Sequence, residues 1–315
     1  MKDWLLKTRF LFMLLFICFA LVSCLETSKL KRISSQVTNS GSIHSIELNS
    51  NVPLSDLIQE LVKADYVLLG EAHDDPEHHR LQNKILEMLV KAGRKPAVVF
   101  EMFNREDAGL VVSTVRRFPH EPDKIAAAVN WKESGWPDWK MYRPMVKTAL
   151  DAGLPVVAGN LSRLKLKRLV INHASVVSSV KIQTQLGLLE PLPEKHKQKL
   201  QGKITTAHSG KIPDTIVKGM LKAQRMRDAT MAEAMIAGNL GQGAVLIAGQ
   251  EHARGDYGVP HYLRFREPEA HIVSLTFAKS IDVASKKSAS EIDAQQAFDY
   301  VWVIPKSKGK RIAHQ

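Results

Sequence analysis

The chain has 315 residues, a hydrophobic fraction of 44% and a formal net charge of +12, which predict a basic globular protein with one large domain or two smaller ones. It contains only two cysteines, Cys18 and Cys24, and no C-x-x-C-H motif, so a disulfide framework, a cysteine-rich metal site and covalent c-type haem are excluded. The cations are dispersed along the chain, so the charge favours anionic lipid surfaces or ligands with carboxylates or phosphates over nucleic acid.

The first 23 residues are typical of a secretory signal peptide. Cations precede an apolar run at 10–22, which is too short to cross a bilayer of about 30 Å as a helix. The sequence Leu21-Val-Ser-Cys24 resembles a bacterial lipobox, in which the signal is removed and the cysteine is lipidated. The alternative is an ordinary signal peptide with an incidental cysteine. Leu25 stands where the retention signal of enteric bacteria has Asp, which favours the outer membrane, facing the periplasm.

The composition divides the rest of the chain into three parts. Residues 24–45 are polar and rich in Ser and Thr, which predicts a flexible tether from the lipidated Cys24. Residues 46–305 are predicted to form a single α/β domain, in which 165–210, rich in Lys, Gln and Pro, form a helical insertion or lobe. Residues 306–315 are a basic tail.

Short β-branched runs alternate with longer helical patterns along the domain. Strands are expected at 66–70, 97–100, 155–158, 244–249, 271–276 and 300–304. Helices are expected at 54–64, 76–92, 138–152 and 213–237. Short continuous apolar runs between helices predict a mostly parallel sheet that is covered by helices on both faces.

The helix at 76–92 begins with clear signals: Asp75 is its N-cap and Pro76 its first residue. His78 shares the inward face of this helix near its N-terminus, while His79 is rotated from it by about 100°. The free N–H groups of the helix end are a suitable seat for a haem propionate or another anion. The alternative is that both histidines are solvated residues of the first turn.

Polar side chains follow four of the predicted strands, and the carboxyl ends of parallel strands are where α/β proteins bind ligands. These residues are Glu71, His73, Glu101, Asn160, Glu251, His252 and Arg254. The first and fourth strand ends share a G-x-x-H pattern, Gly70-Glu-Ala-His73 and Gly249-Gln-Glu-His252. In each, the glycine is expected to let the chain turn sharply off the strand.

These motifs carry a resemblance to a known family. With LLGEAHDDPEHHRLQ, VVFEMF, GWPDWxxYRP, AQRMRDATMA and LIAGQEHARGDYGVPHYL, the chain resembles the ChaN-like haem-binding lipoproteins. They belong to the haem-binding uptake and Tiki superfamily, which includes TraB-like proteins and erythromycin esterases. The resemblance implies an α/β fold, a lipid anchor, a role in haem or iron uptake, and haem held between two subunits with a tyrosine as axial ligand and a histidine nearby. Glu251 departs from the pattern, because a small residue is expected there.

The resemblance and the residue types together give a set of haem-binding candidates: His73, His78, His79, Tyr142, Arg143, His252 and Arg254. A phenolate suits ferric haem, and Tyr142 has aromatic neighbours for a porphyrin and Arg143 for a propionate. Tyr257 and Tyr262 are its rivals. The alternatives are that the histidines are buried and structural and that the tyrosine packs in the core.

Four further residues are candidates for the same site. Glu101 is either a pocket carboxylate or a cap of the following helix. Arg227 reaches a carboxylate of the sheet or a propionate, or else forms an ordinary buried ion pair with Asp228. His208 follows the predicted lobe and is a further pocket candidate.

Two functions from different classes are compatible with these residues. The first is a lipid-anchored haem-binding protein that captures or relays haem for iron uptake, forms a homodimer on haem binding and needs no catalysis. The second is a hydrolase of the Tiki or erythromycin esterase type. In it, Glu71, His73, Glu101 and His252 bind a divalent metal ion and activate water, or His73 acts alone as general base. No residue resembles an activated Ser or Cys nucleophile.

Overall fold

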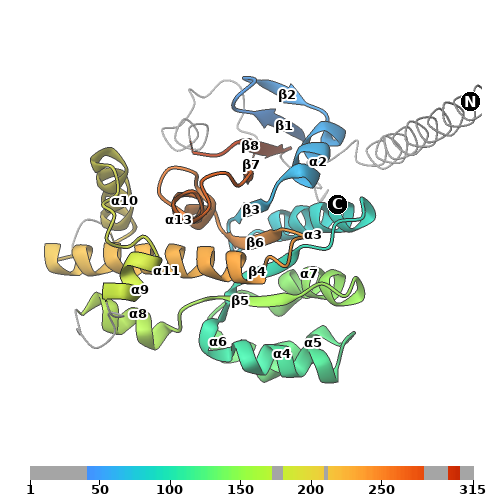
Figure 1. Cartoon of the computed structure of the whole chain (residues 1–315), viewed down its shortest axis with the longest axis horizontal. Coiled ribbons are helices and arrows are strands. Elements are labelled where there is room, and N and C mark those ends of the chain that lie inside the picture. Colours follow the sequence, from blue (N-terminus) through green and yellow to red (C-terminus); the bar gives the residue numbers. More distant parts are fainter. Residues whose placement is uncertain (1–40, 172–179, 209–211, 280–296, 306–315) are drawn as a thin grey trace, which may run out of the picture.

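The computed structural model describes residues 41–171, 180–208, 212–279 and 297–305 (Figure 1). Within these ranges the chain forms an eight-stranded mixed sheet with the order β2-β1-β8-β7-β3-β6-β4-β5. The predicted α/β fold with a mostly parallel, helix-covered sheet is therefore confirmed. The expected signal peptide, Cys24 and the basic tail lie outside the described residues.

The strands from β3 to β8 agree closely with the apolar runs of the sequence. They are β1 (Ser42–Ser45), β2 (Ser50–Val52), β3 (Tyr66–Glu71), β4 (Ala97–Asn104), β5 (Val156–Asn160), β6 (Ala244–Gly249), β7 (Ile272–Lys279) and β8 (Tyr300–Ile304). The pairs among β3 to β8 are all parallel, whereas β1 pairs antiparallel with both β2 and β8. The carboxyl ends of β3, β6, β4 and β5 consequently lie next to one another at one edge of the sheet.

The helices connect these strands and cover both faces. They are α2 (Leu54–Lys63), α3 (Pro76–Lys91), α4 (Ala108–Arg117), α5 (Pro122–Ala128), α6 (Trp131–Ser134), α7 (Trp139–Asp151), α8 (Arg163–Val170), α9 (Val180–Gln185), α10 (Glu194–Ala207), α11 (Asp214–Gly238), α12 (Gln250–Ala253) and α13 (Val259–Arg266), with a 3₁₀ turn, η1 (Arg105–Asp107). The long helix α11 contacts β4, β5 and β6 (Figure 1). Among the residues that the structure describes, no helix is long and apolar enough to cross a membrane.

Two apolar cores lie on opposite faces of the sheet. In β3, Val67 and Leu69 pack into the core beneath α2, α3 and α7. Tyr66 and Leu68 alternate with them and pack into the core beneath α11 and α13. Because successive side chains of a strand point to opposite faces, a strand covered on both sides must be apolar at every position. This explains the continuous apolar runs, and it places the polar residues at the strand ends.

The main difference from the prediction is at the start of the domain. Strand β1 begins at Ser42, within the range 24–45 that was expected to be a tether. The strands β1 and β2 are short, partly exposed and rich in Ser and Asn, so they carry no apolar pattern. Within the described parts of 165–210, α8, α9 and α10 are helices, and residues 186–193 between α9 and α10 are not.

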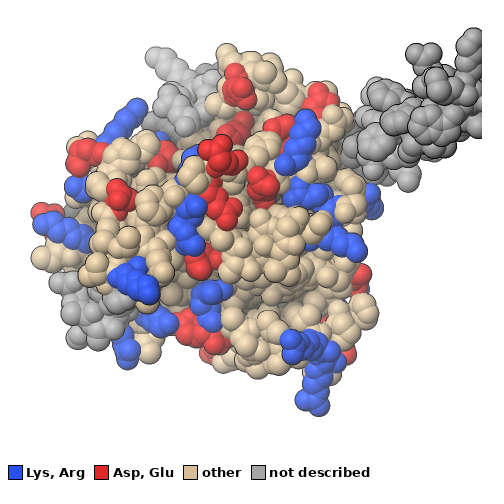
Figure 2. Space-filling view, in the orientation of Figure 1, with Lys and Arg blue, Asp and Glu red and all other residues tan. Residues whose placement is uncertain are grey.

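The surface charge is mixed. On the face shown in Figure 2, lysine and arginine side chains are interspersed with aspartate and glutamate. On this face the basic charge of the chain is therefore distributed rather than gathered into one patch.

Candidate functional site

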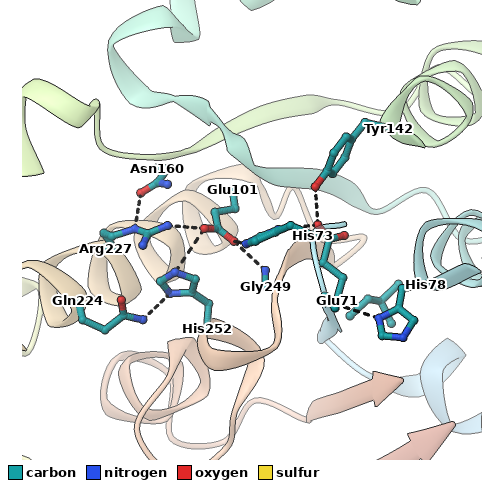
Figure 3. A network of polar contacts seen from close by, with 12 residues as sticks. Glu71, His73, His78, Glu101, Tyr142, Asn160, Gln224, Arg227, Gly249 and His252 are labelled. Atoms are coloured by element: carbon teal, nitrogen blue, oxygen red, sulfur yellow. Dashed lines mark hydrogen bonds and ion pairs between the residues drawn. The ribbon is translucent and has the colours of Figure 1, made fainter. Parts of the chain in front are cut away.

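A continuous chain of ionisable side chains runs along the carboxyl ends of the central strands (Figure 3). Its members, which we call the polar chain, are Glu71, His73, Glu101, His252 and Asp228. Glu71 ends β3, Glu101 lies in β4 and His252 lies in α12, directly after β6. Asp228 comes from α11 on one side of the sheet. The structure thus brings together the residues that the sequence placed at separate strand ends.

Glu71 is the first branch point of the polar chain. It is 1% exposed, and its Oε1 accepts hydrogen bonds from the Nδ1–H of His73 at 2.8 Å and the hydroxyl of Tyr142 at 2.6 Å. Nδ1 of His79 lies 3.2 Å from its other oxygen. Burial acts to raise the pKa of Glu71, but the contacts with His73 and His79 outweigh it, so the pKa lies below its usual value. Glu71 is therefore ionised at neutral pH.

Glu101 is the second branch point. Its Oε2 accepts the backbone N–H of Gly249 at 2.7 Å, and its Oε1 accepts a hydrogen bond from the Arg227 guanidinium. Nε2 of His252 is 3.4 Å from Oε1, and Nε2 of His73 is 3.9 Å from Oε2. Despite burial, which acts to raise it, the pKa of Glu101 is held well below its usual range by His252 and Arg227. Glu101 is therefore a buried acceptor of the polar chain, and its side chain makes no capping hydrogen bond to the turn and helix that follow β4.

The far end of the polar chain is a buried histidine–carboxylate pair. Nδ1 of His252 is 2.5 Å from Asp228 Oδ1, and Gln224 Nε2 lies 3.0 Å from the same nitrogen. Burial and Arg227 act to lower the pKa of His252, but Glu101 and Asp228 outweigh them and raise it to about 9. Burial raises the pKa of Asp228 to about 6 against the opposing effect of His252. Both members of the pair therefore bind a proton more tightly in the fold than in water.

Arg227 and Asn160 brace the same end of the chain. Arg227 Nε donates to Asn160 Oδ1 at 3.2 Å while its terminal nitrogen reaches Glu101. Of the alternatives for Arg227, the contact in the structure is the one with a carboxylate of the sheet, Glu101. This fixes α11 against the ends of β4 and β5.

His73 is the member of the polar chain that solvent reaches. Its side chain is 35% exposed, whereas those of Glu71, Glu101, His252 and Asp228 are 5% exposed or less. The edge of the Trp136 ring packs against it at a centroid distance of 5.1 Å. Any ligand that contacts the polar chain from outside therefore meets His73 first.

The tyrosines proposed as iron ligands are all interior. Tyr142 is fully buried, donates its hydroxyl to Glu71 and packs against Trp131. Burial and the charge of Glu71 raise the pKa of this phenol far above its usual value. Tyr257 and Tyr262 are also fully buried. In this arrangement none of the three presents its oxygen at the surface.

His78 and His79 are buried, with exposures of 5% and 2%, so they are not solvated residues of the first turn. Nδ1 of His78 accepts the backbone N–H of Ala72 at 2.9 Å. Nε2 of His79 donates to the backbone carbonyl of His73, also at 2.9 Å. Both rings therefore hold the loop between β3 and α3 in the shape that places His73.

The N-terminus of α3, expected to seat an anion, is occupied by a carboxylate of the protein. Asp75 accepts the backbone N–H of Glu77 at 3.0 Å. Its other oxygen pairs with Lys279 at 2.7 Å. The first-turn N–H at this end already has an anionic partner, so a propionate would have to displace it.

Three other expected residues point elsewhere. Arg143 is on the surface and forms a two-pronged ion pair with Asp123. Arg254 is 2% exposed and binds Asp256 at 2.7 Å. His208 is exposed at the end of α10, where its ring contacts the carbonyl of Ile204.

The glycines of the two G-x-x-H motifs have a different role from the one expected. Neither has a positive φ, and that of Gly249 is −59°, so the prediction that they allow a sharp turn is wrong. A Cβ on Gly249 would lie 2.7 Å from Nε2 of His73, and a Cβ on Gly70 would lie 3.0 Å from Cβ of Ala253. The glycines are needed because another group packs directly against the backbone.

Sequence reasoning missed the contacts that join the insertion to the second G-x-x-H loop. Lys203 of α10 lies 3.4 Å from Glu251, and Lys199 lies 2.9 Å from Asp256. Glu251 also accepts the hydroxyl of Tyr257. The unexpected acid at this position therefore anchors both a buried tyrosine and a helix of the insertion. No local pattern indicates this pairing, because about fifty residues separate the partners.

The four residues of the metal hypothesis lie side by side but are bonded to protein groups. Glu71 Oε1 accepts from His73 and Tyr142, Glu101 accepts from Arg227 and the Gly249 amide, and Nδ1 of His252 contacts Asp228 and Gln224. In the described ranges no group of three or more His, Cys, Asp or Glu residues is arranged to hold a metal ion. The arrangement is a row of hydrogen-bonded and ion-paired side chains, in which the link between His73 and Glu101 is an ion-pair distance of 3.9 Å.

The fold and the site together define an α/β protein with a buried histidine–carboxylate chain beyond the ends of its parallel strands. The sequence profile of the family described as haem-binding uptake, Tiki superfamily, ChaN matches residues 57–263, well over half of the chain. The chain belongs to this family, and the resemblance noted in the sequence is confirmed.

The solved structures that are similar to the chain are distant in sequence. ChaN of Campylobacter jejuni, from a structure of cofacial haem binding, is 19% identical with a TM-score of 0.65, covering 84% of this chain and 97% of that one. The erythromycin esterase EreC in an open conformation is 13% identical with a TM-score of 0.46, covering 83% and 97%. No curated protein sequence matches the chain.

Proposed function

We propose that this protein is a lipid-anchored haem-binding protein that captures or relays haem at the bacterial envelope. The observation that carries the proposal is the family match over residues 57–263, which contain every member of the polar chain. The Campylobacter jejuni relative binds haem cofacially, so we extend to this chain a homodimer that encloses haem between its subunits. The lipobox at Leu21-Val-Ser-Cys24 supports the anchor, and the net charge of +12 favours a carboxylate-bearing ligand.

Within this proposal, His73 is the residue best placed to contact the haem iron. Its Nδ1–H is donated to Glu71, which leaves the lone pair of the neutral ring on Nε2. Histidines that ligate metals commonly donate their other N–H to a carboxylate, which fixes the ring and raises its basicity. Haem iron accepts an axial nitrogen or oxygen ligand and supplies the Soret band by which binding is followed. The partial exposure of His73 and the adjacent Trp136 suit contact with a flat, apolar ring.

Tyr142 fits the role of axial ligand less well in this arrangement. Its oxygen is fully buried and engaged with Glu71, so it would have to leave a 2.6 Å hydrogen bond to reach a ligand outside. Tyr142 remains the rival ligand in the proposal if α7 rearranges when haem binds.

A hemin titration of residues 25–315, followed by absorbance and size-exclusion chromatography, tests the proposal. We expect a saturable Soret shift with dimerisation, lost in His73→Ala and retained in His208→Ala, whose ring is exposed on α10. A shift that is lost only in Tyr142→Phe would move the iron contact to Tyr142. Absence of any saturable spectral change in the wild-type protein would refute haem binding.

One observation favours a second function, a metal-free hydrolase. His252 and Asp228 form a buried acid–base pair, and the half-exposed His73 is oriented by Glu71 as a general base would be. Hydrolysis of p-nitrophenyl acetate that survives EDTA and disappears in His73→Ala would support this function. A rate equal to that of the His73→Ala variant would contradict it.

A further inference from the structure

A pocket of about 480 Å³ lies between η1, α9, α11 and the end of α13. Its volume is within the range of small-molecule sites, which is about 300–1,000 Å³. The pocket residues that matter here are Arg105, Leu161, Leu186, Thr230, Glu233 and Arg266. None of them belongs to the polar chain.

The position of the pocket in the fold is where α/β proteins bind ligands. Arg105 directly follows β4, and Leu161 directly follows β5. Thr230 lies three residues, or about one turn, beyond Arg227 on α11. The pocket therefore opens beyond the carboxyl ends of two adjacent parallel strands, next to the end of the polar chain that Arg227 and Asn160 brace.

The charges around the pocket are not balanced. Arg266 is paired with Glu233 at 2.5 Å, so these two charges satisfy each other. Arg105 is half-buried and has no hydrogen-bond or ion-pair partner for its guanidinium among the residues the structure describes. A partly desolvated guanidinium without an anionic partner is a ready site for a carboxylate, sulfonate or phosphate, which it can bind in a two-pronged manner.

Part of the pocket wall is apolar. Leu161 and Leu186 pack onto the small core formed by Leu169, Ala223 and Met226. A ligand in the pocket therefore meets the paired charges of Arg266 and Glu233, the guanidinium of Arg105 and an aliphatic surface. This combination selects molecules that carry an anionic group on an apolar body over small inorganic anions, which would gain nothing from the leucines.

We infer that this pocket is a binding site for an amphipathic anion, with Arg105 binding the anionic group and Leu161 and Leu186 contacting the apolar body. The inference does not rest on haem binding by His73, because it uses different residues. The same chemistry has two sources, a free organic acid such as a medium-chain fatty acid and the propionate edge of a tetrapyrrole. In either case Arg105 sets the preference for the anion.

The test uses the fluorescent amphipathic anion 8-anilinonaphthalene-1-sulfonate with the whole mature protein. We expect a saturable fluorescence rise at one site, with affinity at least tenfold weaker in Arg105→Gln. Leu161→Trp, which fills the pocket, should remove the same site. Arg116→Gln, an exposed arginine at the end of α4, is the matched control and should bind as the wild type does. Circular dichroism checks that each variant is folded.

Competition then identifies the source of the anion. Displacement of the probe by decanoate assigns the site to free organic acids, and displacement by one equivalent of hemin assigns it to the tetrapyrrole edge. The inference is overturned if Arg105→Gln binds the probe as tightly as the wild type, or if neither competitor displaces it. Hemin binding is followed separately by its Soret shift. If this shift is the same in Arg105→Gln as in the wild type, haem binding does not depend on Arg105, and this inference can fail while the proposed haem function stands.

Discussion

The ring of His73 is oriented by Glu71, whose Oε1 accepts a 2.8 Å hydrogen bond from Nδ1–H of the histidine. Glu71 is itself held by Tyr142 and approached by His79, so its position is fixed from three sides. The opposite nitrogen of His73 lies 3.9 Å from Glu101, which is beyond hydrogen-bond distance. His73 is thus held on one side and left available on the other.

We predict that Glu71→Gln weakens hemin binding by roughly tenfold or more, because loss of the carboxylate orienting a metal-bound histidine typically has an effect of this size. The amide keeps the shape of the side chain but removes the charge that polarises the ring. Soret titration measures the affinity, and Glu133→Gln, an exposed acid on α6, is the control. An unchanged affinity in Glu71→Gln would mean that His73 does not contact the iron.

Gly249→Ala is predicted to have an effect on hemin binding close to that of His73→Ala. The new Cβ would lie 2.7 Å from Nε2 of His73 and 3.6 Å from Glu101 Oε2, so the ring must move away from its place over the strand end. The backbone conformation itself, with a φ of −59°, accepts alanine without strain.

Gly109→Ala is the matched control for this substitution. Gly109 lies in α4 with nothing within 4 Å of its would-be Cβ, so alanine there should stabilise the helix by about 0.5–1 kcal/mol and leave hemin binding unchanged. Equal hemin affinities in Gly249→Ala and Gly109→Ala would show that the close approach of His73 to Gly249 is unimportant for the ligand.

The sequence is sufficient to predict which strand ends meet, but not what the side chains there do. Glu71, Glu101 and His252 follow apolar runs, and parallel strands place their carboxyl ends at one edge, so their proximity follows from pattern alone. Tyr142 was expected to face a ligand. Its inward direction depends on how α7 packs against α3, a contact between segments far apart in sequence.

The same reasoning explains the other differences. The glycine of G-x-x-H is compatible both with a turn and with a close approach, and only the position of His73 over Gly249 decides between them. The pairing of Glu251 with Lys203 is set by how the insertion lies on the domain, which has no local signal. Tertiary contacts of this kind are beyond the reach of periodicity and spacing.

Glu251→Ala is predicted to loosen α10 while hemin binding persists. The substitution removes the acceptor of the buried Tyr257 hydroxyl and the partner of Lys203, and a buried unpaired hydroxyl typically costs about 1–3 kcal/mol. Hydrogen exchange should become faster across Glu194–Ala207. Glu251→Gln, which keeps an oxygen for Tyr257, should fall between alanine and wild type. Exchange that is unaltered in Glu251→Ala would show that this residue does not hold the insertion.

The stability of the fold is predicted to decrease as the pH rises from about 6.5 to 9. The pKa of His252 is raised to about 9 by Glu101 and Asp228, against burial and Arg227. A histidine with a raised pKa in the folded state contributes stability that is complete below its unfolded pKa, about 6.5, and is lost as the pH rises through the folded value. The size of the shift corresponds to roughly 3 kcal/mol.

Urea denaturation at several pH values measures this dependence. His252→Gln should reduce the fall in the free energy of unfolding between pH 6.5 and 9, although His73 and His79, whose pKa values are also raised by their carboxylate partners, leave part of it. Asp228→Asn should shift the fall to lower pH, because it removes a carboxylate that holds the proton on His252. His208→Ala, on the exposed end of α10, should follow the wild type. If His252→Gln and wild type lose stability equally over this range, His252 is not the buried imidazolium that the contacts of Glu101 and Asp228 imply.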